Sequence, residues 1–164
     1  MTIHAAILTV SDSAVAGTRT DTSGPALAAR AMEIGWAVAA TGLAPDDEAA
    51  IAAKLREWSD AGYALILTTG GTGVAARDVT PEATRSVLDR EIPGIAELMR
   101  TRGLEQTKLA VLSRGLAGQR KQSLIVNLPG SPRGALFSLQ AIEHLIPHVV
   151  DLMRGRTEHA GEAT

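Results

Sequence analysis

Cysteine and aromatic residues are absent or scarce in this 164-residue chain, and each shortage removes a class of function. Because cysteine does not occur at all, disulfides, thiolate nucleophiles and cysteine-ligated metals are excluded. Aromatic residues make up 2%, too few for the stacking platforms that bind single-stranded nucleic acid. The formal net charge of −2 provides no general attraction to DNA or to anionic membranes.

Long apolar segments are missing as well. No stretch approaches the roughly 20 apolar residues that a membrane-spanning helix needs. The apolar run at residues 3–10 is short and follows no basic leader, so we expect a strand there and not a secretion signal. We therefore predict a soluble cytoplasmic protein with no nucleic-acid or membrane partner.

Strand-like and helix-like segments alternate along the chain. Apolar runs predict strands at residues 3–10, 36–43, 63–69 and 123–128. Helical patterns are predicted at residues 24–34, after Asp46 or Asp47, from Thr80, at 95–102, and after Pro132 with a break at Pro147. This alternation indicates an α/β domain whose mostly parallel sheet is covered on both faces. We predict one domain over residues 1–156 and a disordered tail over 157–164.

Four loops that follow predicted strands carry the polar residues of interest. Open α/β sheets bind ligands at the carboxyl ends of their strands. The corresponding loops are residues 11–25, 45–48, 70–81 and 129–134. A ligand site is therefore expected where these four loops meet.

The stretch TTGGTGVAARDVTPEAT, residues 68–84, combines glycines with a basic and an acidic group. Glycines 70, 71 and 73 permit positive φ and let the backbone approach a ligand, so that its amides, with the Thr72 hydroxyl, could bind an anion. Arg77 suits a phosphate oxygen. Thr80 is predicted to cap a helix whose first position is Pro81, and that helix would add its positive dipole end. The chain has neither G-x-x-x-x-G-K-[ST] nor G-x-G-x-x-G, and the glycines alone fit a simple tight turn equally well.

A carboxylate in the same loop conflicts with a plain anion site. Asp78 would repel a phosphate unless a divalent cation lay between them. Mg²⁺ is held in proteins by one or two carboxylates together with substrate phosphates, and Asp46 is the natural second carboxylate, with Asp47 less favoured. Alternatively, Asp78 only stabilises the helix dipole that begins nearby.

Further polar residues lie in the other loops. In NLPGSP, Asn127, Gly130 and Ser131 offer polar contacts, although the same residues fit a rigid turn and a helix cap. The first loop holds Asp12, Ser13, Asp21 and Ser23, which are equally typical of a solvated turn. Ser113 and Arg114 begin a basic segment that is either a charged surface or a contact for an anionic ligand.

Several of these motifs together resemble the MogA/MoaB family of molybdenum-cofactor biosynthesis, which includes the G domain of gephyrin. The resemblance rests on TTGGTG, RDVTPEAT, NLPGSP, SRGLAG and VSDSAVAGTRTDTSGPAL, and it covers about residues 3–155. It implies a three-layer α/β/α fold, commonly a trimer, with hexamers also possible. It also implies adenylylation of molybdopterin by MgATP with release of pyrophosphate, followed by transfer of the product to a separate molybdenum-insertion enzyme.

The resemblance also assigns roles to residues. Asp46 and Asp78 fall on the two catalytic, metal-linked carboxylates. We expect the nucleotide to contact Gly70, Gly71, Thr72, Gly73, Arg77, Asn127, Gly130 and Ser131, and the pterin to contact Asp12, Ser13, Asp21, Ser23 and Ser113. Because both aspartates, Arg77 and TPEAT are present, the chain resembles the catalytic branch; the alternative is a MoaB-type protein that binds pterin or nucleotide without catalysis.

Overall fold

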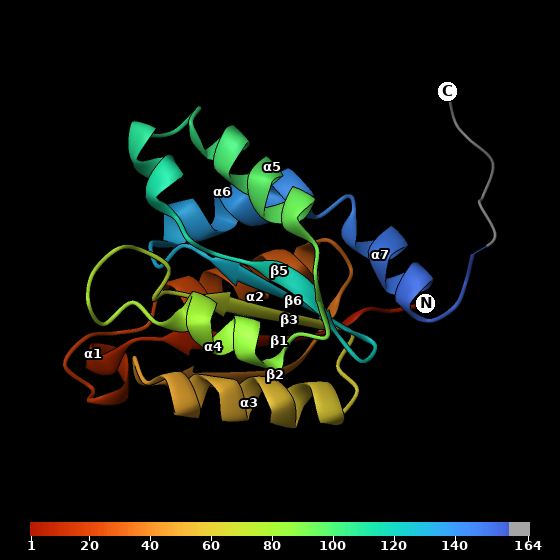
Figure 1. The fold of residues 1–164 in the computed structure, drawn as a ribbon, viewed down its shortest axis with the longest axis horizontal. Helices are drawn as coiled ribbons and strands as arrows, with labels where there is room; N and C mark the ends of the chain where they lie inside the picture. The colour runs from red at the N-terminus through yellow and green to blue at the C-terminus, as the bar shows by residue number, and fades with distance from the viewer. Residues whose placement is uncertain (158–164) are drawn as a thin grey trace.

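The computed structural model describes residues 1–157, which form one mixed six-stranded sheet between two layers of helices (Figure 1). The strands are β1 (His4–Val10), β2 (Ala37–Ala44), β3 (Leu65–Thr69), β4 (Arg90–Glu91), β5 (Ala117–Arg120) and β6 (Ser123–Leu128). The helices are α1 (Asp12–Val15), α2 (Ser23–Glu33), α3 (Glu48–Asp60), α4 (Thr80–Val87), α5 (Pro93–Gly103), α6 (Pro132–Ile142) and α7 (Ile146–Met153), with a 3₁₀ helix η1 (Lys108–Leu112). The three-layer α/β/α prediction is confirmed.

Strand order and register bring the predicted loops to one edge of the sheet. The order is β2-β1-β3-β6-β5-β4; β2, β1, β3 and β6 run parallel, β5 pairs antiparallel with β6, and β4 pairs antiparallel with β5. The last residues of the parallel strands stand in register: Val10 beside Ala44, Thr9 beside Thr69, and Thr69 beside Leu128. After β1 the chain crosses to β2 on one side, whereas β3 lies on the other side of β1. A crevice therefore opens between the carboxyl ends of β1 and β3.

The period-2 alternation of the strands divides the apolar side chains into two cores. In β1, Ile7 faces the core formed with α2, α5, α6 and α7, whereas Leu8 faces the core formed with α3 and α4. Figure 1 shows the same division, with α3 and α4 on one side of the sheet and α2, α5 and α6 on the other. The central strands are buried on both faces, which explains why they are continuous apolar runs in the sequence.

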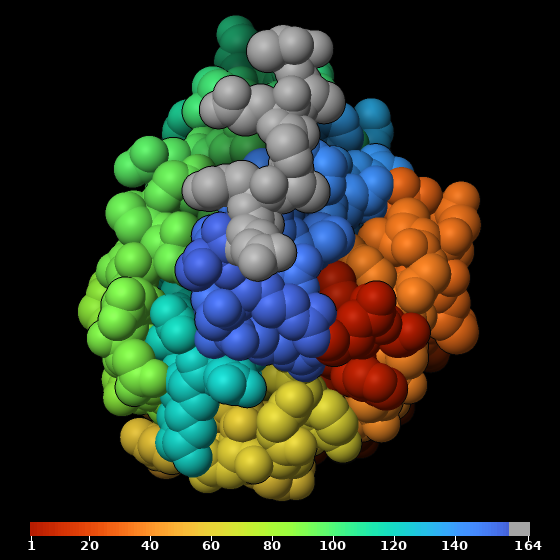
Figure 2. All heavy atoms as spheres, turned by 90° about the vertical axis from the view of Figure 1, so that its right-hand side faces the viewer, coloured from red at the N-terminus to blue at the C-terminus, as the bar shows by residue number. Residues whose placement is uncertain are grey.

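Both ends of the described chain lie at the edge opposite the predicted loops. Figure 2 shows the N-terminal residues beside α7, and an Arg154 guanidinium reaches the sulfur of Met1. Of the predicted tail, residues 158–164 lie outside the described part of the chain. Within residues 1–157, no helix combines the length and apolar character that crossing a bilayer requires.

Two predicted helix boundaries were wrong in detail. Thr80 is the first residue of α4, and Val79 occupies the cap position; the Thr80 hydroxyl donates to the Gly70 carbonyl at 2.9 Å. The predicted break and final helix are present, but the break lies at residues 143–145, after α6 ends at Ile142, and Pro147 lies in the first turn of α7. A proline there needs no hydrogen-bond partner for its nitrogen, which is why the helix begins around it. Of the two aspartates predicted as the possible start of the next helix, Asp47 caps α3, its side chain accepting from the Ala50 N–H at 2.8 Å.

Candidate active site

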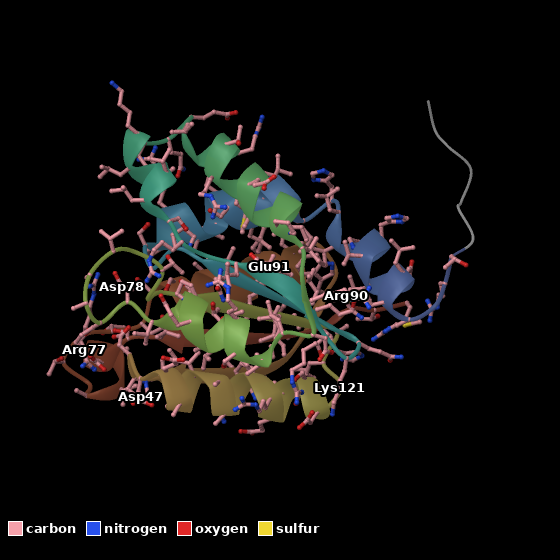
Figure 3. All side chains as sticks on the ribbon, viewed as in Figure 1. Asp47, Arg77, Asp78, Arg90, Glu91 and Lys121 are labelled. Atoms are coloured by element: carbon pink, nitrogen blue, oxygen red, sulfur yellow. The ribbon has the colours of Figure 1, made fainter. Side chains whose placement is uncertain are left out.

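A polar cavity of about 340 Å³ lies at the carboxyl ends of β1 and β3. It receives residues from all four predicted loops: Ser11, Ala14, Arg19, Thr20, Asp21, Thr22, Ser23, Asp46, Gly70, Gly71, Asp78, Gly130 and Ser131, with Thr9, Val10 and Thr69 from the strand ends. Asp46 and Asp78 line this one cavity although they are far apart in sequence. Figure 3 shows Asp78, Arg77 and Asp47 at the same end of the molecule.

Close backbone packing explains two of the glycines. Gly70 has φ +102°, and a Cβ there would lie 2.3 Å from the Val10 carbonyl oxygen. A Cβ on Gly130 would lie 3.3 Å from the Cα of Gly70. The turns after β1, β3 and β6 therefore touch through main-chain atoms, which only glycine permits at position 70.

The other two glycines of the GGTG motif make room for the carboxylates. Gly71 has φ +69°, and a Cβ there would lie 3.3 Å from Asp46 Oδ1 and 2.3 Å from the Thr80 hydroxyl. Gly73 does not have positive φ, so that part of the prediction was wrong for this glycine; a Cβ there would lie 2.8 Å from Asp78 Oδ2. Each aspartate thus packs against a glycine that has no side chain in its way.

Some of the backbone donors predicted to bind an anion are already used. The Gly70 amide donates to Leu128 O at 3.1 Å, and the Thr80 amide, at the start of α4, donates to Gly71 O at 3.1 Å. The amides of Gly71 and Gly73 make no such bond within residues 1–157. The loop's capacity to donate to a phosphate therefore rests on Gly71 and Gly73 more than on Gly70 or the helix terminus.

Reciprocal hydrogen bonds join the loop that carries Asp12 to the loop that carries Asp46. The Asp12 amide donates to Asp46 Oδ2 at 3.0 Å, and the Asp46 amide donates to Asp12 Oδ1 at 2.9 Å. Arg77 Nε donates to Asp12 Oδ2 at 2.6 Å, and Arg77 Nη2 donates to the Asp46 carbonyl at 3.3 Å. The hydrogen bond from Arg77 lowers the pKa of Asp12, and the hydrogen bond from the Asp46 amide lowers it further by a smaller amount. Sequence alone gave no sign that Arg77 and Asp12 pair with each other.

The predicted pterin-side residues separate into three groups. Asp21 and Ser23 line the polar cavity, where Asp21 accepts from the Thr9 hydroxyl at 2.8 Å and from the Gly24 amide at 3.0 Å. Asp12 and Ser13 line neither of the two main cavities, and the Ser13 hydroxyl lies 3.1 Å from that of Ser11. Ser113 lines a second cavity.

This second, largely apolar cavity of about 330 Å³ lies beside the first and shares Ser131 with it. Four residues predicted for the nucleotide line it: Thr72, Gly73, Asn127 and the shared Ser131. Its apolar wall comes from α5, η1 and α6, including Met99, Leu109, Leu112 and Phe137, which sequence analysis did not identify. Phe137, one of only four aromatic residues in the sequence, was the one residue of this wall that could have indicated an apolar ligand cavity. Arg77 lines neither cavity, so the predicted nucleotide set is not gathered in one place.

Asn127 is saturated by internal hydrogen bonds. It is 1% exposed; its Oδ1 accepts from the Leu116 amide at 3.0 Å, and its Nδ2 donates to the hydroxyls of Thr68 at 3.0 Å and Thr84 at 2.9 Å. The amide side chain therefore joins β6 to the 113–116 segment and to α4. Similarly, Ser131 caps α6 by accepting from the Gly134 amide at 3.1 Å.

The two cavity aspartates suit a hard divalent cation. Asp46 Oδ2 accepts from the Asp12 amide and Asp78 Oδ2 from the Ala75 amide, both at 3.0 Å, while Oδ1 of each makes no hydrogen bond within residues 1–157. Over the same residues no group of three His, Asp or Glu side chains forms a complete metal cage. Two carboxylates completed by phosphate oxygens and water match the way Mg²⁺ is usually bound.

Fold and site together define the class: an open α/β domain with an acidic, glycine-walled ligand cavity at its topological switch point. Residues 6–148 match the family described as "Probable molybdopterin binding domain". The chain belongs to this family, and the resemblance first drawn from its motifs is confirmed.

Relatives and solved structures agree with the assignment. The chain is 38% identical over 169 residues to the molybdopterin adenylyltransferase of Helicobacter pylori strain J99, covering 98% of this chain and 93% of that protein. The Molybdenum cofactor synthesis protein cinnamon of Drosophila melanogaster is 43% identical over 152 residues, but the chain spans a quarter (25%) of its length. The crystal structure of the molybdopterin biosynthesis enzyme MoaB from Thermus thermophilus superposes with a TM-score of 0.86 at 52% identity, covering 93% of this chain and 97% of that one.

Proposed function

We propose that the protein is a molybdopterin adenylyltransferase that transfers AMP from MgATP to the terminal phosphate of molybdopterin and releases pyrophosphate. The observation that carries the proposal is the convergence of Asp46 and Asp78 on one polar cavity beside the glycine turns. Relatives of nearly the same length named molybdopterin adenylyltransferase support it. The activity fits molybdenum-cofactor biosynthesis, as the family resemblance implies.

The chemistry requires little from protein side chains beyond position and charge. An ionised oxygen of the pterin's phosphate monoester attacks the α-phosphorus of ATP; the new P–O bond forms as the bond from that phosphorus to the α–β bridging oxygen breaks. Pyrophosphate carries away the electron pair. Because the nucleophile is already ionised at neutral pH, no serine, cysteine or strong base is needed, and catalysis consists of orientation and charge stabilisation.

Within this proposal, Asp46 and Asp78 would hold Mg²⁺, which when bound offsets charge on the triphosphate and the departing pyrophosphate. The amides of Gly71 and Gly73 would donate to phosphate oxygens. The neighbouring apolar cavity, with Thr72, Ser113 and Phe137, would take a flat ring. The same proposal includes a homotrimer, a cytoplasmic location and hand-off of the product to a molybdenum-insertion enzyme. Light scattering would measure the oligomeric state directly.

Asp78→Asn tests the proposal directly. Asparagine retains the oxygen that accepts from the Ala75 amide, so the loop should keep its shape while losing one negative charge. We expect Mg²⁺-dependent pyrophosphate release from ATP and molybdopterin to fall at least about 100-fold, comparable to loss of a key electrostatic group.

The matched control is Asp151→Asn on α7, where a half-exposed carboxylate pairs with Arg156 at 3.2 Å. It should leave turnover unchanged. Full activity of the Asp78 variant would reject Asp78 as a metal ligand.

The second candidate is the non-catalytic MoaB-type binder that the family resemblance left open; the solved neighbour at 52% identity shares the MoaB name, although it is described as a biosynthesis enzyme. If the wild-type protein binds molybdopterin or ATP but releases no pyrophosphate with both substrates and Mg²⁺ present, the binder is the better assignment.

A further inference from the structure

Arg114 makes an unusual set of contacts for a residue that the sequence presents only as part of a basic segment. Its Nε donates to Gly73 O at 2.7 Å, its Nη2 donates to Asp78 O at 2.7 Å, and its Nη1 pairs with the Glu82 carboxylate. Its backbone amide also donates to Thr72 O at 2.8 Å. One guanidinium thus bonds both ends of the 73–78 loop and the first turn of α4.

The 73–78 loop has little else to hold it. Within it, the Ala75 amide donates to Asp78 Oδ2 and the Asp78 amide donates to Ala75 O, both at 3.0 Å, so these bonds close a local turn without tying that turn to the domain. Val74, at its tip, is 70% exposed. The Arg77 contacts to Asp12 and Asp46 lie on the exposed rim, where water competes with them.

The segment that carries Arg114 is itself firmly anchored. Arg100 on α5 donates to the carbonyls of Ser113 at 3.4 Å and Gly115 at 3.1 Å, and the Leu116 amide donates to the buried Asn127 side chain. The guanidinium therefore projects from a fixed base. The planar guanidinium spreads its donors over three nitrogens and can bond acceptors that lie well apart, whereas the three donors of a lysine share one nitrogen.

We propose that Arg114 is a positioning residue that joins the two ends of the 73–78 loop and so fixes where Asp78 presents its carboxylate to the polar cavity. The consequence for Mg²⁺ rests on the proposed function, whereas the effect on the loop does not.

Two measurements on the whole protein test this. Hydrogen exchange of the amides of residues 73–79, in the absence of ligand, reports the loop alone. In Arg114→Ala these amides should exchange at least about tenfold faster, because a factor of ten corresponds to losing about one hydrogen bond to a charged group. Arg114→Lys should lie between, since it keeps the charge beside Glu82 but cannot span both carbonyls.

The second measurement is the Mg²⁺ concentration needed for half-maximal ATP binding, followed by calorimetry, and for half-maximal turnover. Both should rise at least about tenfold in Arg114→Ala, while kcat at saturating Mg²⁺ falls by a smaller factor. Arg102→Gln removes an exposed arginine paired with Glu105 at 3.0 Å and should change neither quantity. If Arg114→Ala does not fold, Arg114→Lys carries the same comparison.

The outcomes separate the two proposals. Unchanged loop exchange overturns the positioning role, and so does faster exchange with an unchanged Mg²⁺ requirement, since the residue would then be merely structural. Failure of the wild-type protein to release pyrophosphate overturns the proposed reaction, but the exchange and ATP-binding measurements still decide the role of Arg114.

Discussion

Asn127 offers the sharpest test of the difference between a binding residue and a structural one. We predict that Asn127→Ala destabilises the fold by about 2–4 kcal/mol. The Leu116 amide would lose its acceptor, the Asn127 Oδ1, and a buried unsatisfied donor costs about 1–3 kcal/mol. The lost packing and the two Thr hydroxyls left to find other partners add to this.

The magnitude is large against a total stability of about 5–15 kcal/mol for a domain of this kind. Urea unfolding followed by circular dichroism measures it directly. The control is Gln119→Ala, which truncates an exposed amide whose side chain donates only to Lys121 O, and which should change stability by less than about 0.5 kcal/mol.

A charge variant sharpens the test further. In Asn127→Asp, burial would raise the pKa of the new carboxyl. At low pH the carboxyl would be protonated and could donate a hydrogen bond, whereas as pH rises through that pKa its ionisation would destabilise the folded state. The deficit relative to wild type should therefore grow with pH. If instead Asn127→Ala unfolds at the same urea concentration as wild type and loses only nucleotide affinity, the side chain serves the ligand and our structural account is wrong.

Two further predictions concern backbone crowding and surface charge. Gly70→Ala should destabilise by at least about 2 kcal/mol, because φ +102° disfavours any side chain and its Cβ would lie 2.3 Å from Val10 O; Gly94→Ala, with open space around its Cβ, should be neutral or slightly stabilising in urea unfolding, and equal effects would refute the crowding argument. A hydrogen bond from Lys121, with a smaller effect from Arg120, lowers the pKa of Asp60 from 3.8 to about 2. The contribution of the ionised Asp60 to folding stability is therefore present above pH 3.8 and is lost as the pH falls through about 2. The stability difference between wild type and Asp60→Asn should vanish over that range, and a difference independent of pH would contradict this assignment.

Much of the fold was predictable because its central strands are continuous apolar runs. β4 and β5 were not predicted: β5 reads AGQR and β4 has two exposed residues, so neither carries a hydrophobic pattern. β5 forms because it makes a hairpin with β6, whose turn places Lys121 at φ 53°. The Lys121 amide donates to the Asp89 side chain at 2.7 Å, which ties this turn to the segment just before β4. Such pairing depends on long-range partners that a local pattern does not contain.

The candidate site was predictable as a set of loops but not as a set of contacts. The fold rule correctly brought Asp46 and Asp78 to one cavity. It could not show that Arg114, expected on a charged surface or against a ligand, holds the loop from within, or that Asn127 is saturated. Arginine and asparagine have the same donors in either role, and only the coordinates of the neighbouring loops decide between them.

The position of Arg77 shows how one residue can serve the site without entering the cavity. It precedes Asp78 directly, yet it lies on the rim, where it bonds the Asp12 side chain and the Asp46 carbonyl. It therefore connects the loop of Asp78 to the loop of Asp46 from outside the polar cavity, without touching either of the two cavity carboxylates. Because its pair with Asp12 is exposed, water weakens the bond, and in the proposed reaction a polyphosphate would offer this guanidinium a bidentate partner. A bidentate phosphate contact that used Nε would require Arg77 to leave Asp12, and the reciprocal amide bonds between Asp12 and Asp46 would still hold the first two loops together.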